Sequence, residues 1–328
     1  MKNRYYITII IALLTLVACQ KEELYMGPCS VNFSAYMQEE NVVSRASAGY
    51  KDIDKTHPSF TAGLFVHAGN NNYVPSTLEW NSEKGEKGTL TTSLKLEQGS
   101  YTIYGYMPYS NGTTFEPVTR VMTIPDLPGM SASNAMVIKP VGVEIGNKTT
   151  NVEVNLEMDH LMARVTPCFY INDAAYAALR KIKIKKVEFI LPNVKSYTAT
   201  VKYAPNGSET HTTTWTDDGD DKANEVTFYE ENTNPMELQL GKAKAIPHST
   251  CYFCPSQPVD GLKMRVTYDV FDAKGNLTRP NAVAENNIKK ISGTLKEATN
   301  YKLYIPLVPS YLYALSDGDM DSNILVVE

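Results

Sequence analysis

Apolar and polar residues alternate with a period of two along most of this chain, which is the pattern of strands that bury one face. A clear example is the run in which Val31, Phe33, Ala35 and Met37 alternate with mostly polar neighbours. Similar short runs recur in both halves of the chain, separated by turn residues. The pattern predicts an all-β fold of two tandem β-sandwich domains with about seven strands each.

Little of the sequence predicts helix. The pair Asn172-Asp173 can cap one short helix over residues 174–180. The alternation over residues 182–191 changes phase at residues 185–186, which predicts a β-bulge. The polar and acidic span 210–224 predicts a surface loop.

The first 18 residues have the pattern of a signal peptide. A positively charged start is followed by a mostly apolar run over residues 7–17, which is too short to span a membrane as a helix. The run ends in Leu16-Val17-Ala18-Cys19, and small residues before a cysteine resemble a bacterial lipobox. In that interpretation Cys19 is lipidated and becomes the new N-terminus. The alternative is an ordinary signal peptide that happens to contain a cysteine.

The length that remains, about 310 residues, is enough for two domains. The strand pattern changes near residue 160, where an apolar run with a new alternation begins. We therefore expect an N-terminal domain over residues 19–160 and a C-terminal domain over residues 161–328.

Composition and motifs exclude several classes of function. The net charge is -5 and no basic patch is visible, which argues against nucleic acid as a partner. The five histidines form neither HxxxH nor HExxH, and the sequence has no GxSxG elbow and no P-loop. We expect a protein that is not an enzyme and that holds no cofactor and no metal.

Two clusters of possible ligands have plainer interpretations. Cys251 and Cys254 form a CxxC, but on a strand they point to opposite faces and would not share one metal ion. Buried or loosely paired cysteines are the favoured interpretation, with a redox or metal role as the alternative. The acidic run 217–221 resembles the start of a calcium loop but lacks its terminal glutamate, so a solvated loop is favoured over a cation site.

Aromatic and histidine side chains leave one further alternative open. His160 lies where one strand pattern gives way to the next, which favours a packed, hydrogen-bonded histidine over a ligand. Tyr101, Tyr104, Tyr106 and Tyr109 could form an aromatic platform for a glycan. Alternation places Tyr104 and Tyr106 on one face and the other two on the opposite face, which favours ordinary packing.

Several motifs together resemble one family. The run 101–108 looks like that family's strand ending in an aromatic-x-Pro, the run 158–165 like its histidine-containing apolar run, and residues 293–307 like its late strand. With the lipobox and the early strand, the chain resembles the fimbrillin-like proteins of Bacteroidales, which are subunits of type V pili. The resemblance covers essentially the whole chain and implies two transthyretin-like sandwiches.

This resemblance implies a mechanism and a set of partners. The lipoprotein precursor reaches the outer surface of the outer membrane, and a trypsin-like protease cuts between Arg45 and Ala46. The strand that carries Val31, Phe33, Ala35 and Met37 then leaves, and a strand from another pilin subunit fills the groove, as in β-strand addition. The candidate donor residues are Tyr311, Tyr313, Leu315, Ile324 and Val326.

Alternatives stay open at each step. Arg45 is also an ordinary surface arginine in a polar link, and the C-terminal run is also a final strand of its own domain. Without cleavage, the same molecule would be a monomeric surface lipoprotein that binds a glycan or another ligand. In the fimbrial interpretation, the subunit would contribute to adhesion, and a host or bacterial surface ligand is a possible further partner.

Overall fold

Strands dominate this protein, and the all-β prediction is confirmed. The computed structural model describes residues 27–38, 41–42, 50–53, 57–69, 72–85, 88–147, 149–205, 210–246, 251–289 and 291–307. These residues form three sheets and one α-helix, α2 (Ala174–Leu179). The helix begins at the predicted cap, because the side chain of Asp173 accepts a hydrogen bond from the backbone N–H of Tyr176.

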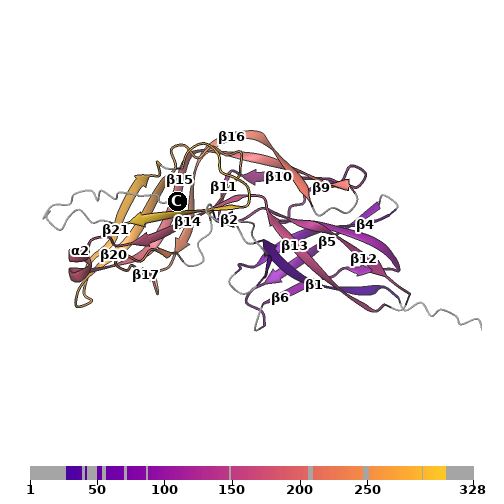
Figure 1. Ribbon diagram of the computed structural model, residues 1–328, viewed down its shortest axis with the longest axis horizontal. Helices are drawn as coiled ribbons and strands as arrows, with labels where there is room; N and C mark the ends of the chain where they lie inside the picture. Colours follow the sequence, from indigo (N-terminus) through magenta and orange to yellow (C-terminus); the bar gives the residue numbers. More distant parts are fainter. Residues whose placement is uncertain are drawn as a thin grey trace, which may run out of the picture.

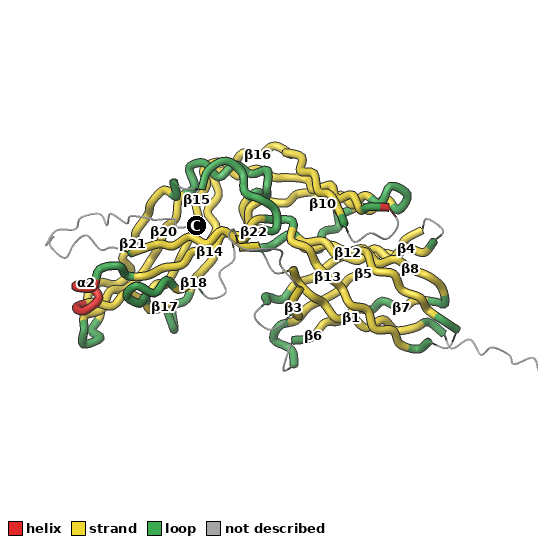
Figure 2. The backbone as a smooth tube through the Cα atoms, viewed as in Figure 1, coloured by secondary structure: helices red, strands yellow, loops and turns green. Residues whose placement is uncertain are grey.

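The first sheet, called here the N-terminal sheet, occupies the right half of Figure 1. Its described strands are β3 (Tyr50–Asp52), β1 (Cys29–Gln38), β13 (Asn151–His160), β12 (Met136–Ile145), β8 (Gly99–Met107), β4 (Phe60–Ala68), β5 (Asn72–Asn81) and β6 (Thr89–Thr92), in that order. β7 (Lys95–Leu96) follows β6 after two residues and pairs with β1. The sheet therefore curls back towards its own beginning (Figure 2) and encloses an apolar core.

The second sheet, the long-strand sheet, runs over both halves of the molecule (Figure 1). Its order is β21 (Leu277–Asn287), β20 (Lys263–Asp272), β15 (Arg180–Tyr203), β10 (Val121–Pro128) and β9 (Thr114–Glu116), and β16 (His211–Glu230) and β17 (Met236–Glu237) also pair with β15. β15 is 24 residues long. Its first half pairs with β20 and its second half with β10, while β16 accompanies it over most of its length.

The third sheet, the C-terminal sheet, combines short strands from distant parts of the chain. Its order is β11 (Met130–Ser131), β19 (Cys251–Phe253), β14 (Ala163–Tyr170), β22 (Thr299–Pro306) and β2 (Asn41–Val42), and β18 (Lys244–Ala245) pairs with β14. The pairings of β22 with β14 and with β2 are parallel. Phe169 and Phe253 of this sheet share one core with Phe189 and Tyr268 of the long-strand sheet.

A further core joins the two halves of the molecule. Phe65, Tyr104 and Tyr106 project from the outer face of the N-terminal sheet and pack in one cluster with Ile124 of β10 and Val201 of β15. The second half of the long-strand sheet therefore covers the N-terminal sheet as an outer layer. Backbone hydrogen bonds cross the expected boundary at residue 160, and that boundary stays a prediction.

The structure bears on two local predictions, the β-bulge at residues 185–186 and the surface loop at residues 210–224. The bulge is confirmed, because the register of β15 against β20 shifts between Ile184 and Lys186. The surface loop over residues 210–224 is wrong, since this span lies in β16 and pairs with β15. Its threonines and Trp215 suit a strand, and the pairing satisfies backbone groups that a loop would expose.

Candidate functional site

β1 lies in a parallel pair with β13, and this pair forms the candidate site. The register runs from Ser30 opposite Asn151 to Met37 opposite Met158. The side chains of Val31, Ala35 and Met37 are buried and that of Phe33 is half-buried, all four facing the core of the curled sheet. The predicted period-2 strand is therefore confirmed, with its apolar face inward.

The opposite edge of β1 is only partly paired. β7 pairs with the first two residues of β1, Cys29 and Ser30, and β3 pairs with residues 36–38 of β1. Within the described residues, no strand pairs with Val31–Ser34 on that edge. Parallel pairing is slightly less stable per residue than antiparallel pairing, so the backbone holds β1 less firmly than a strand paired on both edges.

Burial of apolar side chains also stabilises the position of β1. Leu156 and Met158 of β13, together with Leu96 of β7, belong to the same buried cluster as the inward residues of β1. Cys29 at the start of the strand is fully buried, and burial raises the pKa of its thiol. If β1 left, an apolar groove and an unpaired edge of β13 would remain.

Several predicted site residues lie outside the described residues. They are the lipidation site Cys19, the cleavage residues Arg45 and Ala46, and the candidate donor residues Tyr311, Tyr313, Leu315, Ile324 and Val326. β1, the strand that is expected to leave after cleavage, is therefore the part of the predicted site that the structure places. Its departure, and each of these residue roles, stays a prediction.

The possible calcium loop lies within β16. Lys195 donates a hydrogen bond to the carboxylate of Asp217, and Asp218 accepts one from Thr198 at 2.9 Å. The hydrogen bond with Lys195 and one from the backbone N–H of Gly219 lower the pKa of Asp217. Both carboxylates thus have partners within the sheet, and no group of three potential metal ligands occurs among the described residues.

The cysteines of the CxxC lie in different cores, as strand alternation predicts. Cys251 belongs to the C-terminal core, and Cys254 belongs to the cluster that joins the two halves. Both are free and buried, and burial raises the pKa of each thiol. Since the thiolate is the reactive form, these cysteines act as packed apolar side chains.

His160 and the strand tyrosines are packing residues. His160 is buried at the end of β13 and hydrogen-bonds with the amide of Asn134. Tyr104 and Tyr106 are buried in the cluster between the two layers, so they form no glycan platform. Tyr109 is 46% exposed and stacks on Tyr106 with ring centroids 6.4 Å apart.

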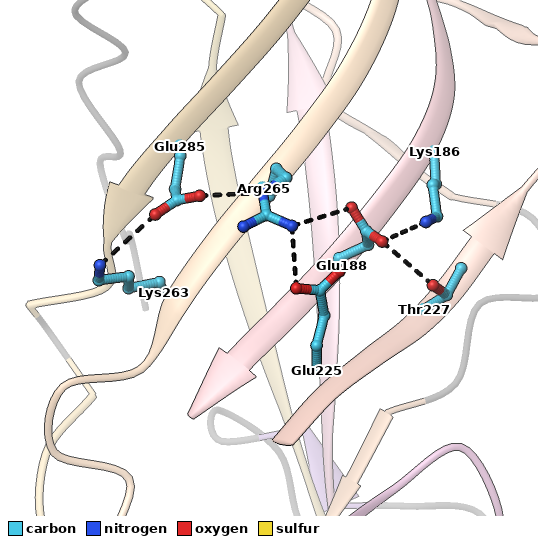
Figure 3. Close-up of polar contacts among 7 residues, drawn as sticks. All are labelled: Lys186, Glu188, Glu225, Thr227, Lys263, Arg265 and Glu285. Atoms are coloured by element: carbon cyan, nitrogen blue, oxygen red, sulfur yellow. Dashed lines mark hydrogen bonds and ion pairs between the residues drawn. The ribbon is translucent and has the colours of Figure 1, made fainter. Parts of the chain in front are cut away.

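A network of charges crosses four strands of the long-strand sheet (Figure 3). Arg265 of β20 bonds with Glu225 of β16 and Glu285 of β21, both at 2.9 Å, and approaches Glu188 of β15 at 3.8 Å. Lys186 and Thr227 also bond with Glu188, which is 3% exposed. These side chains connect four neighbouring strands on one face of the long-strand sheet.

The pKa values follow from this geometry. Burial tends to raise the pKa of Glu188, but hydrogen bonds from Lys186 and its other partners outweigh burial and lower it. The hydrogen bond from Arg265 lowers the pKa of Glu285. The sequence predicts no such network, because its residues come from four separate strands. A weak signal is present in the spacing of two between Lys186 and Glu188 and between Lys263 and Arg265, which puts each pair on one face of its strand.

The chain is similar to several solved structures, at low sequence identity. No protein-family model and no curated protein matches the chain. A candidate cell adhesion protein from Bacteroides ovatus is 13% identical, with 90% of this chain and 95% of that chain covered and a TM-score of 0.42. One from Bacteroides fragilis is 10% identical, with 91% and 100% covered and a TM-score of 0.45.

A third structure, of candidate polysaccharide binding proteins from Bacteroides thetaiotaomicron, is 11% identical, with 86% of this chain and 94% of that chain covered and a TM-score of 0.34. At these identities and TM-scores the likeness carries no inference about function.

Among the described residues, no helix has the length and apolar character needed to cross a membrane.

Proposed function

We propose that this protein is a stalk or tip subunit of a surface fimbria that polymerises by strand exchange. The observation that carries the proposal is β1, a strand held by parallel pairing and inward apolar side chains and followed closely by the polar link with Arg45. A cut after Arg45 removes the covalent connection of β1 to the rest of the sheet. From then on, only non-covalent contacts keep the strand in place.

A donor strand from another subunit restores what β1 provided. It pairs with the free edge of β13 and inserts apolar side chains at alternate positions, as Val31 and Ala35 do. The C-terminal run contains two such alternations, one with Tyr311, Tyr313 and Leu315 and one with Ile324 and Val326. We propose that one of them is the donor.

The proposed setting is the outer surface of the outer membrane. Cys19 carries the lipid that anchors the precursor, and a trypsin-like protease cuts between Arg45 and Ala46. The assembled fimbria contributes to adhesion.

The test treats the full precursor with trypsin and analyses it by SDS-PAGE without boiling. A ladder of SDS-resistant oligomers is expected for the native chain and for Arg45→Lys, which trypsin also cleaves. Arg45→Ala should give no ladder, while Arg180→Ala, at an exposed arginine after α2, should behave as the native chain does. A ladder that forms in Arg45→Ala, or a trimmed monomer alone from the native chain, would overturn the proposal.

One observation favours a second function, in which a monomeric surface lipoprotein binds a glycan. Tyr73 is 39% exposed and lies edge-on to buried Phe65, at 5.3 Å between ring centroids. Phe65 stacks on Tyr106, which in turn stacks on exposed Tyr109. Exposed aromatic rings on a rigid base suit stacking against sugar rings. Binding of the uncleaved monomer to a glycan array, lost in Tyr73→Ala with Tyr109→Ala, would support this function.

A further inference from the structure

Two β-bulges lie on either side of β20 in the long-strand sheet. On the β15 side the register shifts at Lys185, which is an extra residue without a partner position in β20. On the β21 side the register shifts at Asp269 of β20, which stands opposite two residues, Pro280 and Asn281. Bulges re-aim side chains and occur often beside functional sites. Here two of them bring side chains from three strands to one place.

The three side chains form a connected group. Nζ of Lys185 donates a hydrogen bond to Oδ1 of Asn281 at 2.8 Å and lies 3.8 Å from Oδ2 of Asp269. Oδ1 of Asp269 accepts a hydrogen bond from the backbone N–H of Asn281 at 2.7 Å. Asn281 has a φ of 50°, in the left-handed region, which asparagine adopts more readily than most residues. The carboxylate of Asp269 therefore holds the backbone of the asparagine with one oxygen and faces the lysine amine with the other.

An amine, an amide and a carboxylate in contact can exchange one amide bond for another. Cγ of Asn281 is bonded to Oδ1, so it lies within reach of the lysine nitrogen that contacts this oxygen. Reacting groups held in such contact gain an effective concentration of about 10⁵–10⁸ M. A neighbouring carboxylate can accept the proton that the amine must lose before it attacks. Lys139 also bonds with a neighbouring strand, but its partner at 3.1 Å is the carboxylate of Glu157, which does not acylate an amine.

We infer that Lys185 and Asn281 form an intramolecular isopeptide bond, with Asp269 as the proton acceptor. Oδ2 of Asp269 takes one proton from the ammonium group of Lys185, and the neutral Nζ attacks Cγ of Asn281. A second proton passes from the attacking nitrogen to Nδ2, and the bond between Cγ and Nδ2 breaks. Asp269 returns its proton to the released ammonia. One ammonium ion leaves, the positive charge of the lysine leaves with it, and no oxidant or cofactor is consumed.

The surroundings of the three residues suit a reaction that takes place once. The side chains of Lys185 and Asp269 are 21% and 13% exposed, so neighbouring strands restrict both, whereas Asn281 is exposed and lets the ammonium ion escape into water. The bond joins β15 to β21 across β20, between residues 96 apart in the sequence. A cross-link over such a distance constrains the unfolded chain, as a disulfide does. The inference needs neither cleavage after Arg45 nor strand exchange.

Mass spectrometry of the full, uncleaved chain carrying Cys19→Ser tests the bond. The chain should be lighter than its sequence requires by the mass of one ammonia molecule. Complete digestion with trypsin should yield residues 184–186 joined to residues 275–289, because the linked Lys185 is no longer cleaved and Arg279 precedes a proline. Lys185→Arg keeps the positive charge but lacks the amine, and Asn281→Asp keeps the shape but lacks the amide. Both variants should have their full mass and no linked peptide.

Two further variants separate the proposed roles. Asp269→Asn removes the proton acceptor and should slow formation of the bond at least 10-fold. Lys183→Arg is the matched control, because Lys183 is two residues away in β15 and its amine lies 3.9 Å from Glu237, so this variant should form the bond as the native chain does.

A native chain of full mass without the linked peptide would overturn the inference. A loss of ammonia that persists in Lys185→Arg would overturn it too, by assigning the loss to cyclisation at an asparagine–glycine pair such as Asn111-Gly112. Bond formation at an unchanged rate in Asp269→Asn would overturn the role of Asp269.

Discussion

Ala35 of β1 lies directly opposite Leu156 of β13 in a parallel register, and both side chains are buried. The methyl group of Ala35 faces the core of the curled sheet, whereas the preceding residue, Ser34, is exposed. These two adjacent positions therefore point to opposite faces of the strand. This makes them a matched pair for measuring how much the inward face of β1 contributes.

The first prediction concerns that face. Ala35→Asp places a carboxylate without a partner in an apolar core, which should lower the free energy of unfolding by about 3–5 kcal/mol. Ser34→Asp should change it by less than about 0.5 kcal/mol, because the side chain stays in water. Urea unfolding followed by circular dichroism measures both. Equal losses in the two variants would contradict the orientation of β1.

The second prediction uses the buried thiol of Cys29 as a reporter of strand release. In the intact chain carrying Cys19→Ser, all described cysteines are buried, so Ellman's reagent should react slowly. After trypsin cleavage and strand exchange, one thiol per chain should react quickly as Cys29 becomes exposed. The control is Cys29→Ser, in which no fast phase should appear. A cleaved, assembled chain without the fast phase would show that β1 stays in place.

The third prediction concerns the close approach of Gly63 to Tyr106 across β4 and β8. A Cβ atom on Gly63 would overlap the buried ring of Tyr106, whose hydroxyl donates a hydrogen bond to the carbonyl of Ser110 at 2.7 Å. Gly63→Ala should therefore destabilise the fold by about 1–3 kcal/mol. Gly142→Ala is the control, because no atom lies within 4 Å of its Cβ position. Thermal unfolding of both variants should separate them clearly.

The fourth prediction concerns the charge network of Figure 3. Arg265→Met removes the shared partner of three carboxylates and leaves buried Glu188 with one cation fewer, so a loss of about 3 kcal/mol is expected. Lys263→Met removes only an exposed ion pair with Glu285 at 3.4 Å and should cost less than about 1 kcal/mol. Chemical unfolding at neutral pH measures the difference.

The stability difference between the native chain and Arg265→Met should depend on pH. The folded-state pKa values of Glu188 and Glu285 are lowered, so their contribution is present above the unfolded pKa and is lost as the pH falls through the folded pKa. The gap in stability between the native chain and Arg265→Met should therefore narrow as the solution is made more acidic than the usual glutamate pKa. A gap that stays constant to low pH would contradict this assignment.

The sequence predicts local features of this fold better than its pairings. The inward face of β1 and the bulge at Lys186 follow from alternation alone, because burial of one face imposes a period of two. The parallel partner of β1 does not follow, since β13 lies more than a hundred residues away in the sequence and no local signal selects it. The sequence therefore predicts β1 itself but neither its partner strand nor the core residues against which it packs.

β16 shows why the predicted loop was wrong. Between Thr210 and Asn224 the chain has almost no apolar alternation, so hydrophobic periodicity gives no strand signal. Its pairing depends on β15, which supplies backbone partners along 15 positions. A cross-strand row of threonines likewise forms only when four strands come into register, and its members are Thr114, Thr123, Thr200 and Thr214.

The length of β15 has a mechanical consequence. Its 24 residues form one uninterrupted backbone of up to about 80 Å that belongs to both halves of the molecule. Bending one half away from the other would strain this strand and its hydrogen bonds with β16 together. Tension along β15 would load many bonds in shear at the same time. The two halves of the molecule should therefore resist stretching as one stiff unit rather than separate as two independently linked domains.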